Sequence, residues 1–163
     1  MEMDGLHPQA HRMGVTIRPL RASDRDAVAA MLVECGAFSD EEVHVALEMA
    51  DSDDYILFAA ELGGEIIAYT CIGPTPLTLS TWHLYWICVH PHAQRRGAGT
   101  ALQVYVEDYV RAAGGERVVV ETSGRPDYER ARRFYEKGGY RIAGRIPDYY
   151  KSGDDCVFYF KVL

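Results

Sequence analysis

Apolar residues follow two patterns along this 163-residue chain, continuous β-prone runs and helical spacing, and these divide it into predicted strands and helices. Residues of high β-propensity gather in seven short runs, which predict strands at 15–18, 55–61, 65–72, 81–90, 117–121, 140–145 and 156–162. Apolar residues at helical spacing predict four helices, which begin near Ser23, Ser39, Gly97 and Pro126. This order of elements describes a mixed α/β sheet with helices on both of its faces.

Capping residues and glycine pairs mark the ends of these elements. Ser23 and Ser39 are each followed three residues later by an acidic residue, a pattern that predicts two helix N-caps. The pair Gly63-Gly64 predicts a hairpin turn, because it tolerates positive φ. No repeat or long linker divides the chain, so we expect a single domain at 15–163 after a loose leader at 1–14.

Composition narrows the class of protein. The chain is 48% apolar and 25% charged, as is typical of a soluble globular protein, and its net charge of -7 argues against a nucleic-acid partner. The four cysteines are widely spaced, which indicates a reducing compartment and no metal site. No apolar run reaches the ~18 residues needed to span a bilayer. We therefore expect a cytoplasmic protein with no membrane partner.

An anion-binding turn is predicted at residues 94–100, between the strand at 81–90 and the following helix. Its sequence is Gln-Arg-Arg-Gly-Ala-Gly-Thr. The first turn of a helix leaves backbone N–H groups unpaired, and glycines let a bulky anion approach them. The turn lacks the spacing and the Gly-Lys-Ser/Thr ending of a Walker loop, and it lacks the third glycine of a dinucleotide fold. These features predict a pyrophosphate site.

Two motifs resemble one known family. Residues 94–99 match the Q/R-x-x-G-x-G/A signature of the GCN5-related N-acetyltransferases. The run 130–140 resembles the second hallmark of that family, a helix that bears Phe-Tyr-Glu and ends in Gly-Tyr. The resemblance covers about residues 15–163. It implies a mixed, mostly antiparallel sheet of six to seven strands, with a V-shaped splay between the fourth and fifth strands.

The resemblance also implies the donor substrate, acetyl-CoA, whose pantetheine arm would lie in the V and whose pyrophosphate would lie on the turn. It assigns cofactor binding to Ile87, Cys88, Val89, Gln94, Arg95, Arg96, Gly97, Ala98, Gly99, Thr100 and Phe134. The acetyl group would pass directly to a primary amine in a ternary complex.

Three residues are candidates for proton transfer. By resemblance, Tyr135 occupies the position of the general acid beside the CoA sulfur; the alternative is a core tyrosine with its hydroxyl bonded to the backbone. The backbone N–H of Val89 would stabilise the oxyanion. Many relatives carry a glutamate early on the strand at 81–90, but here the nearest candidate base is His83. Another subset uses a glutamate at the end of the next strand, which corresponds to Glu121; the alternative is an exposed strand-end carboxylate.

The acceptor side is predicted at residues 145–155, between the last two strands. This segment resembles a Tyr-Tyr-x-x-Gly-Asp-Asp stretch of N-terminal protein acetyltransferases and would bring Asp148, Tyr149 and Tyr150 to a cationic amine. Residues 122–128 lack the Ser-Asn-x-x-Ala run common in those enzymes, which favours a small molecule or amino acid as acceptor. A peptide acceptor, and a CoA-sensing module without turnover, stay open. The resemblance also makes a homodimer possible.

Overall fold

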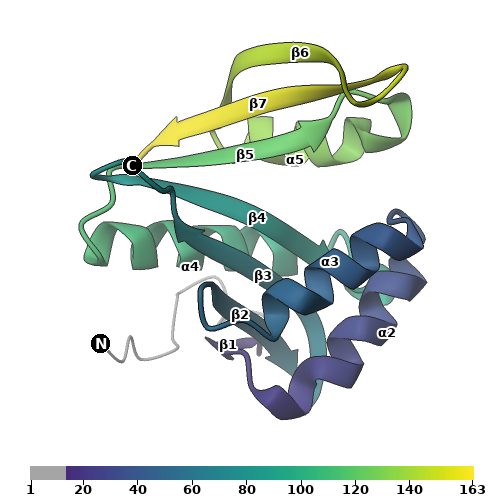
Figure 1. The fold of residues 1–163 in the computed structure, drawn as a ribbon. Helices are drawn as coiled ribbons and strands as arrows, with labels where there is room; N and C mark the ends of the chain where they lie inside the picture. The colour runs from purple at the N-terminus through teal and green to yellow at the C-terminus, as the bar shows by residue number, and fades with distance from the viewer. Residues whose placement is uncertain (1–13) are drawn as a thin grey trace. The chain divides into compact units, whose positions relative to one another are not determined.

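The computed structural model describes residues 14–163, so residues 1–13 of the predicted leader lie outside the described residues. A sheet of seven strands has the order β1-β2-β3-β4-β5-β7-β6 (Figure 1). Its strands are β1 (Thr16–Pro19), β2 (Ile56–Leu62), β3 (Glu65–Pro74), β4 (Thr81–Val89), β5 (Arg117–Ser123), β6 (Arg141–Lys151) and β7 (Asp154–Val162). The α-helices are α2 (Arg25–Cys35), α3 (Asp40–Ala50), α4 (Ala98–Ala112) and α5 (Glu129–Lys137). The predicted order of elements is confirmed.

Two compact units make up the fold. The first contains the described residues up to 73 together with 86–109, and the second contains 74–85 and 110–163. The single domain at 15–163 therefore stays a prediction. None of the helices in the described span combines the length and the apolar character that crossing a bilayer requires.

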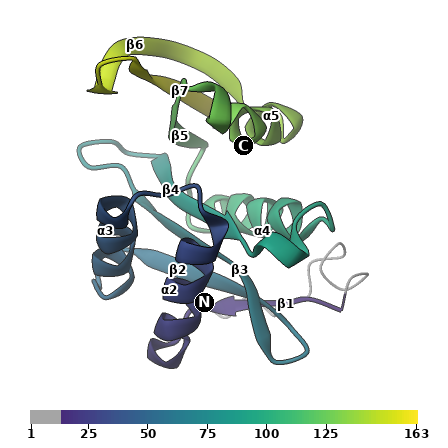
Figure 2. The same cartoon turned by 90° about the vertical axis from the view of Figure 1, so that its right-hand side faces the viewer.

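In the first unit, neighbouring residues of β2 face opposite layers of helix. Ala59 belongs to a buried cluster with residues of α2 and α3, whereas the ring of Phe58 lies 5.0 Å from those of Tyr105 and Tyr109 on α4. This alternation follows from the two-residue period of a strand. Figure 2 shows the result, with α2 and α3 on one side of β2 and β3 and α4 on the other.

The two predicted serine caps have different outcomes. Ser39 caps α3 through the amide of Glu42 at 3.3 Å, and the Glu42 carboxylate accepts from the Ser39 amide at 2.7 Å. The Ser23 prediction is wrong, because Ser23 lies inside a 3₁₀ helix (Ala22–Asp24) and α2 begins only afterwards. The Asp24 carboxylate belongs to the entry of this 3₁₀ helix, where it accepts from the Arg21 amide at 2.7 Å and pairs with Arg18. Asp24 precedes α2 directly but makes no side-chain capping bond to it.

The second unit is built around β5. This strand pairs with β7 along its whole length, from Arg117 to Ser123, but its parallel register with β4 runs only from Thr81–Arg117 to His83–Val119. Helix α5 packs on this part of the sheet through the rings of Tyr135 and Tyr159, whose centroids are 5.9 Å apart. The Tyr159 hydroxyl also donates to the carboxylate of Glu136 at 2.9 Å.

Strand β6 is longer than predicted, and it contains a bulge. The sequence predicts a strand at 140–145 followed by a polar loop, but β6 continues to Lys151. Ile146 pairs with Cys156 and Lys151 pairs with Asp154, so four residues of β6 lie opposite one residue of β7. We call residues 147–150 the β6 bulge. The prediction failed here because Pro147 and the turn-forming residues after it favour a loop, whereas pairing with β7 resumes beyond them.

Candidate functional site

The predicted anion-binding turn opens helix α4. A 3₁₀ helix (Pro91–Ala93) precedes it, and Arg95 and Gly97 then adopt positive φ angles of 65° and 88°. The first helical hydrogen bond runs from the Ala101 amide to the Gly97 carbonyl at 2.9 Å. The amides of α4 before Ala101 therefore have no acceptor within the helix, and they lie at its positive end.

Charge and side-chain size in the turn both suit an anion. Arg95, Arg96 and Gly97 are exposed, and the first turn of α4 carries no acidic residue. Ala98 and Gly99, in contrast, are buried, so the helix start packs closely against the rest of the first unit. The arginines keep a permanent positive charge. The local structure can therefore hold a phosphate on backbone amides.

The residues before this turn are fixed by contacts to one carbonyl group. The side-chain amide of Gln94 donates to the Val89 carbonyl at 3.1 Å, and the Cys35 thiol reaches the same oxygen at 3.4 Å. The sulfur of Cys35 also lies 3.3 Å from that of Cys88, which is buried. The contact with Cys35 and burial both raise the pKa of the Cys88 thiol. Gln94 is predicted to bind the cofactor, and its side chain also helps to hold the backbone at Val89.

Tyr135 lies on α5 in the second unit. Its ring packs against those of Phe134, Tyr140 and Tyr159 at centroid distances of 5.5 to 5.9 Å. Burial raises the pKa of Tyr135, so its hydroxyl is protonated throughout the neutral range. Both roles given for Tyr135, a general acid and a core tyrosine, therefore stay predictions.

The two candidate bases lie side by side. His83 on β4 pairs in register with Val119, and Glu121 is two residues further along β5 on the same face. The nitrogen Nε2 of His83 is 3.9 Å from Oε1 of Glu121. The ring of His83 stacks on that of Tyr85 at 4.4 Å with an interplanar angle of 7°.

Burial shifts the pKa of both candidate bases toward the uncharged form. It lowers the pKa of His83 and raises the pKa of Glu121. A strong ion pair would shift both values the opposite way, so at 3.9 Å the two groups interact weakly and His83 is neutral at pH 7. Glu121 is therefore a stronger base than an exposed carboxylate.

Two tyrosines of the β6 bulge approach Glu121. The charge of Glu121 is the main cause that raises the pKa of Tyr149, and it also contributes to the raised pKa of Tyr150, where burial is the main cause. The Tyr150 hydroxyl lies 3.5 Å from the sulfur of Cys156, which is fully buried. The bulge thus brings two phenols into the neighbourhood of the carboxylate predicted to be the base.

Asp148 has a structural position in the same bulge. Its φ angle is 52°, its amide donates to Asp155 at 3.0 Å, and its carboxylate accepts from the Gly153 amide at 2.6 Å. Asp155 in turn pairs with Arg145 at 2.6 Å. These bonds fix the shape of the bulge and the turn that follows it.

The structure assembles part of the predicted site and adds residues to it. His83, Glu121, Tyr149 and Tyr150 come together in the second unit, whereas Ile87, Cys88, Val89 and the anion-binding turn belong to the first. Sequence reasoning missed Tyr85 and Cys156. Tyr85 could have been found, because it shares a strand face with His83 at a spacing of two residues. Cys156 gives no local signal, since only the β6–β7 register brings it to Tyr150.

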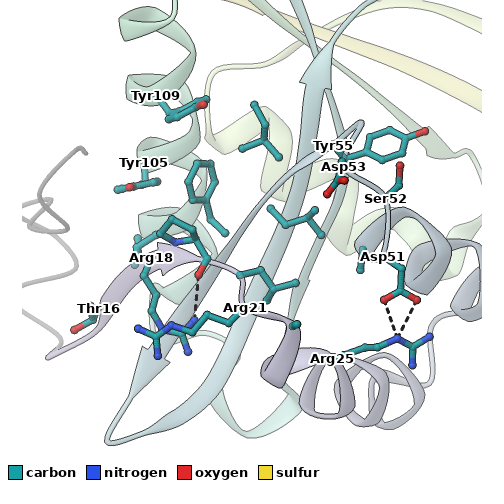
Figure 3. Close-up of a pocket in the computed structure, with 18 residues that line it drawn as sticks. Thr16, Arg18, Arg21, Arg25, Asp51, Ser52, Asp53, Tyr55, Tyr105 and Tyr109 are labelled. Carbon is teal, nitrogen blue, oxygen red and sulfur yellow. Dashed lines mark hydrogen bonds and ion pairs between the residues drawn. The ribbon is translucent and has the colours of Figure 1, made fainter. Parts of the chain in front are cut away.

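A cavity of about 920 Å³ lies elsewhere in the first unit (Figure 3). Its lining comes from β1, β2, the ends of α2 and α3, and two tyrosines of α4, Tyr105 and Tyr109. Three arginines line it; Arg18 pairs with Asp24 and Glu61, and Arg25 pairs with Asp51. None of the predicted site residues lines this cavity.

Comparison with known proteins gives one consistent match. A profile of the acetyltransferase (GNAT) family matches residues 25–140. The uncharacterized N-acetyltransferase YhfO of Bacillus subtilis is 29% identical over 135 residues, which are 77% of this chain and 89% of that protein.

Solved structures agree. A GNAT-family acetyltransferase from Desulfovibrio desulfuricans is 36% identical, with a TM-score of 0.87 over 91% of this chain and 98% of that one. An aminoglycoside 6'-N-acetyltransferase complexed with coenzyme A shares the fold at 20% identity, with a TM-score of 0.73 over 90% of this chain and 96% of that one.

Proposed function

The chain belongs to the GNAT family of acetyltransferases, and on that premise we propose that it moves the acetyl group of acetyl-CoA to the primary amine of a small molecule or amino acid. The reaction would take place in a ternary complex, in a cytoplasmic protein. The amine nitrogen attacks the thioester carbon, the C–S bond breaks, and the products are the N-acetyl compound and free CoA.

The observation that carries the donor half is the turn at the start of α4. Unpaired amides, two exposed arginines and no acidic residue occur together there. A pyrophosphate is the part of acetyl-CoA that this arrangement suits best. The solved relative that binds coenzyme A has the same fold, which supports the choice of CoA over another phosphorylated ligand.

The proposed chemistry divides proton transfer between two residues. Glu121, whose pKa is raised by burial, would take a proton from the incoming ammonium, directly or through water. Tyr135, which is protonated at neutral pH, would give a proton to the departing thiolate, and the second proton that the nitrogen loses as the amide forms would restore Tyr135. The Val89 amide would donate to the oxyanion between these steps.

The pKa of the acceptor decides how much a base is needed. A lysine-like amine with a pKa near 10.4 is neutral in about one of ~2,500 molecules at pH 7, which costs roughly 4.6 kcal/mol. An α-amine with a pKa near 7.8 costs only about 1 kcal/mol. Glu121 should therefore matter more for alkyl amines than for amino acids.

A second candidate is a peptide N-terminus as acceptor. It is favoured by Tyr149 and Tyr150, which lie in the β6 bulge near Glu121 and are 48% and 47% exposed. Two exposed phenols are a larger surface than a small diamine needs. The same two side chains could also enclose an aromatic or sugar-like small acceptor.

The test is a screen of amines and of short peptides with acetyl-CoA, with free CoA measured as it forms. Release with a small amine or an amino acid supports the proposal, and release with peptides alone replaces it by the second candidate. If acetyl-CoA raises the melting temperature but no acceptor yields CoA above hydrolysis, the chain is a CoA-sensing module. If acetyl-CoA at millimolar concentration gives no stabilisation, all three are wrong.

A further inference from the structure

A histidine pair just before the anion-binding turn has no role in the proposed reaction. His90 directly follows Val89, the last residue of β4, and His92 lies in the 3₁₀ helix that comes next. Pro91 separates the two histidines. Their rings are 4.0 Å apart and tilted by 47°. Proline fixes its own φ, so the backbone between the two imidazoles has little freedom.

A carboxylate from another strand completes the group. Glu65 begins β3, and its Oε1 lies 3.7 Å from Nε2 of His92. One ligand atom from each of Glu65, His90 and His92 lies within 4.8 Å of the other two. Ligand atoms around a tetrahedral zinc ion are roughly 3.4 Å apart, given metal–ligand distances near 2.1 Å. The side chains of Glu65 and His92 are 62% and 45% exposed, so they can close that difference by rotation.

The two ring nitrogens of His90 have different surroundings. Its Nε2 lies 2.9 Å from the carboxylate of Glu34 on α2, and its Nδ1 is buried without a hydrogen-bond partner among the described residues. A neutral imidazole that donates from Nε2 keeps its lone pair on Nδ1. Metal-binding histidines typically have a carboxylate beside their second nitrogen, and Glu34 lies in that position at Nε2 of His90. The backbone of His90 is fixed too, because its amide donates to Ile67 at 2.8 Å.

From this geometry we infer a divalent-metal site formed by Nδ1 of His90, His92 and the carboxylate of Glu65, with Glu34 as the residue that positions His90. Two imidazole nitrogens and one carboxylate oxygen suit zinc, nickel or cobalt better than magnesium or calcium. The site would be open at its remaining positions. All four residues belong to the first unit, so a bound ion would link α2, β3 and the segment that leads into the anion-binding turn. The cysteine spacing had predicted no metal site, and these residues contain no cysteine.

The test is calorimetric titration of chelator-treated protein with Zn²⁺, without acetyl-CoA. We expect one site, lost or weakened at least tenfold in His92→Asn and in Glu65→Gln, because each removes one of three ligands. Glu34→Gln should weaken binding by roughly 10- to 100-fold, as loss of an outer-shell partner does elsewhere. The circular-dichroism spectra of these variants should match the wild type, since the three side chains are at least 45% exposed.

Two control variants separate this site from other histidines. His44→Asn removes a similar exposed pair, since His44 lies 3.3 Å from Glu48 on α3, and it should leave binding unchanged. The double variant His7→Asn, His11→Asn, titrated in the same way, measures any zinc binding by the histidines of residues 1–13. Zinc affinity that is unchanged in both His92→Asn and Glu65→Gln, or absent in the wild type, overturns the inference. The titration does not depend on acetyl transfer, so its outcome is separate from that of the proposed function.

Discussion

The proposed donor turn and the proposed acceptor side of this protein are built by different means. In the turn at residues 94–100, the binding groups are backbone amides at a helix start, and the side chains mainly supply charge and permit the conformation. On the acceptor side, His83, Glu121, Tyr149 and Tyr150 come from three strands and meet through register and a bulge. A backbone site needs only a local sequence, whereas a side-chain site depends on the whole sheet. The first should resist single side-chain changes that alter the second strongly.

The largest expected effect is that of Tyr135→Phe. Removing a general acid commonly costs 10²- to 10⁴-fold, so kcat should fall at least ~100-fold while the acetyl-CoA Kd changes less than about twofold. Steady-state kinetics and calorimetry measure the two quantities. Tyr159→Phe is the matched control, because it removes a hydroxyl that bonds Glu136 and should cost about 1 kcal/mol of stability without slowing turnover. Equal kcat in Tyr135→Phe and wild type would remove this residue from the mechanism.

Glu121→Gln and His83→Gln separate the two candidate bases. We expect a loss of about 100-fold in kcat/KM for Glu121→Gln with an alkyl amine, and less than tenfold for His83→Gln. Burial raises the pKa of Glu121, so the acid limb of the wild-type pH profile should lie above the ordinary glutamate value of about 4.3 and disappear in Glu121→Gln. The reverse order of losses would make His83 the base.

The same raised pKa of Glu121 has a consequence for stability. A carboxyl group whose folded pKa exceeds its unfolded value favours folding below the unfolded pKa, and that contribution is lost as pH rises through the folded pKa. Glu121→Gln should therefore melt above the wild type at pH 7, and the difference should vanish near pH 3. Melting curves across this range, followed by circular dichroism, measure it. A variant that is less stable than wild type at pH 7 would contradict the assigned environment.

Gly97→Ala should weaken the donor turn alone. A Cβ at φ 88° is strained by about 1–2 kcal/mol and crowds an anion on the neighbouring amides, so we expect the acetyl-CoA Kd to rise roughly 10- to 30-fold. Gly114→Ala carries the same kind of strain at φ 83°, with no atom within 4 Å of its Cβ, and should lose stability but bind acetyl-CoA normally. Thermal shift with acetyl-CoA distinguishes them. Equal shifts in both variants would place the anion elsewhere.

The smallest effect is expected at the β6 bulge. Tyr149→Phe removes one hydroxyl, and a hydrogen bond of about 1 kcal/mol corresponds to roughly fivefold in KM for the acceptor, with the acetyl-CoA Kd unchanged. Tyr55→Phe, in the cavity of the first unit, is the control and should leave both constants unchanged. A larger change in acetyl-CoA binding than in the acceptor KM would break the division between the two regions.

The sequence predicts the local features of this protein, but it does not predict those that depend on contacts between distant segments. The order of strands and helices and the cap at Ser39 are local patterns, and the structure confirms them. The Ser23 cap failed because residues 22–24 form a 3₁₀ helix, in which Asp24 accepts from the Arg21 amide and pairs with Arg18 of β1. The extension of β6 to Lys151 and the contact of Tyr150 with Cys156 depend on pairing between strands, which no single segment encodes. The histidine cluster of Glu65, His90 and His92 was missed for the same reason.

The β6 bulge also bears on how such an enzyme can diverge. Its four residues lie opposite a single residue of β7, and paired positions resume on both sides at Ile146 and Lys151. A lineage can therefore lengthen, shorten or replace this segment while the flanking pairs keep their register and the core stays packed. The residues proposed to meet the acceptor are thus the ones whose number the fold constrains least. Changes of acceptor among descendants of this protein should begin there, by insertion or deletion as readily as by substitution.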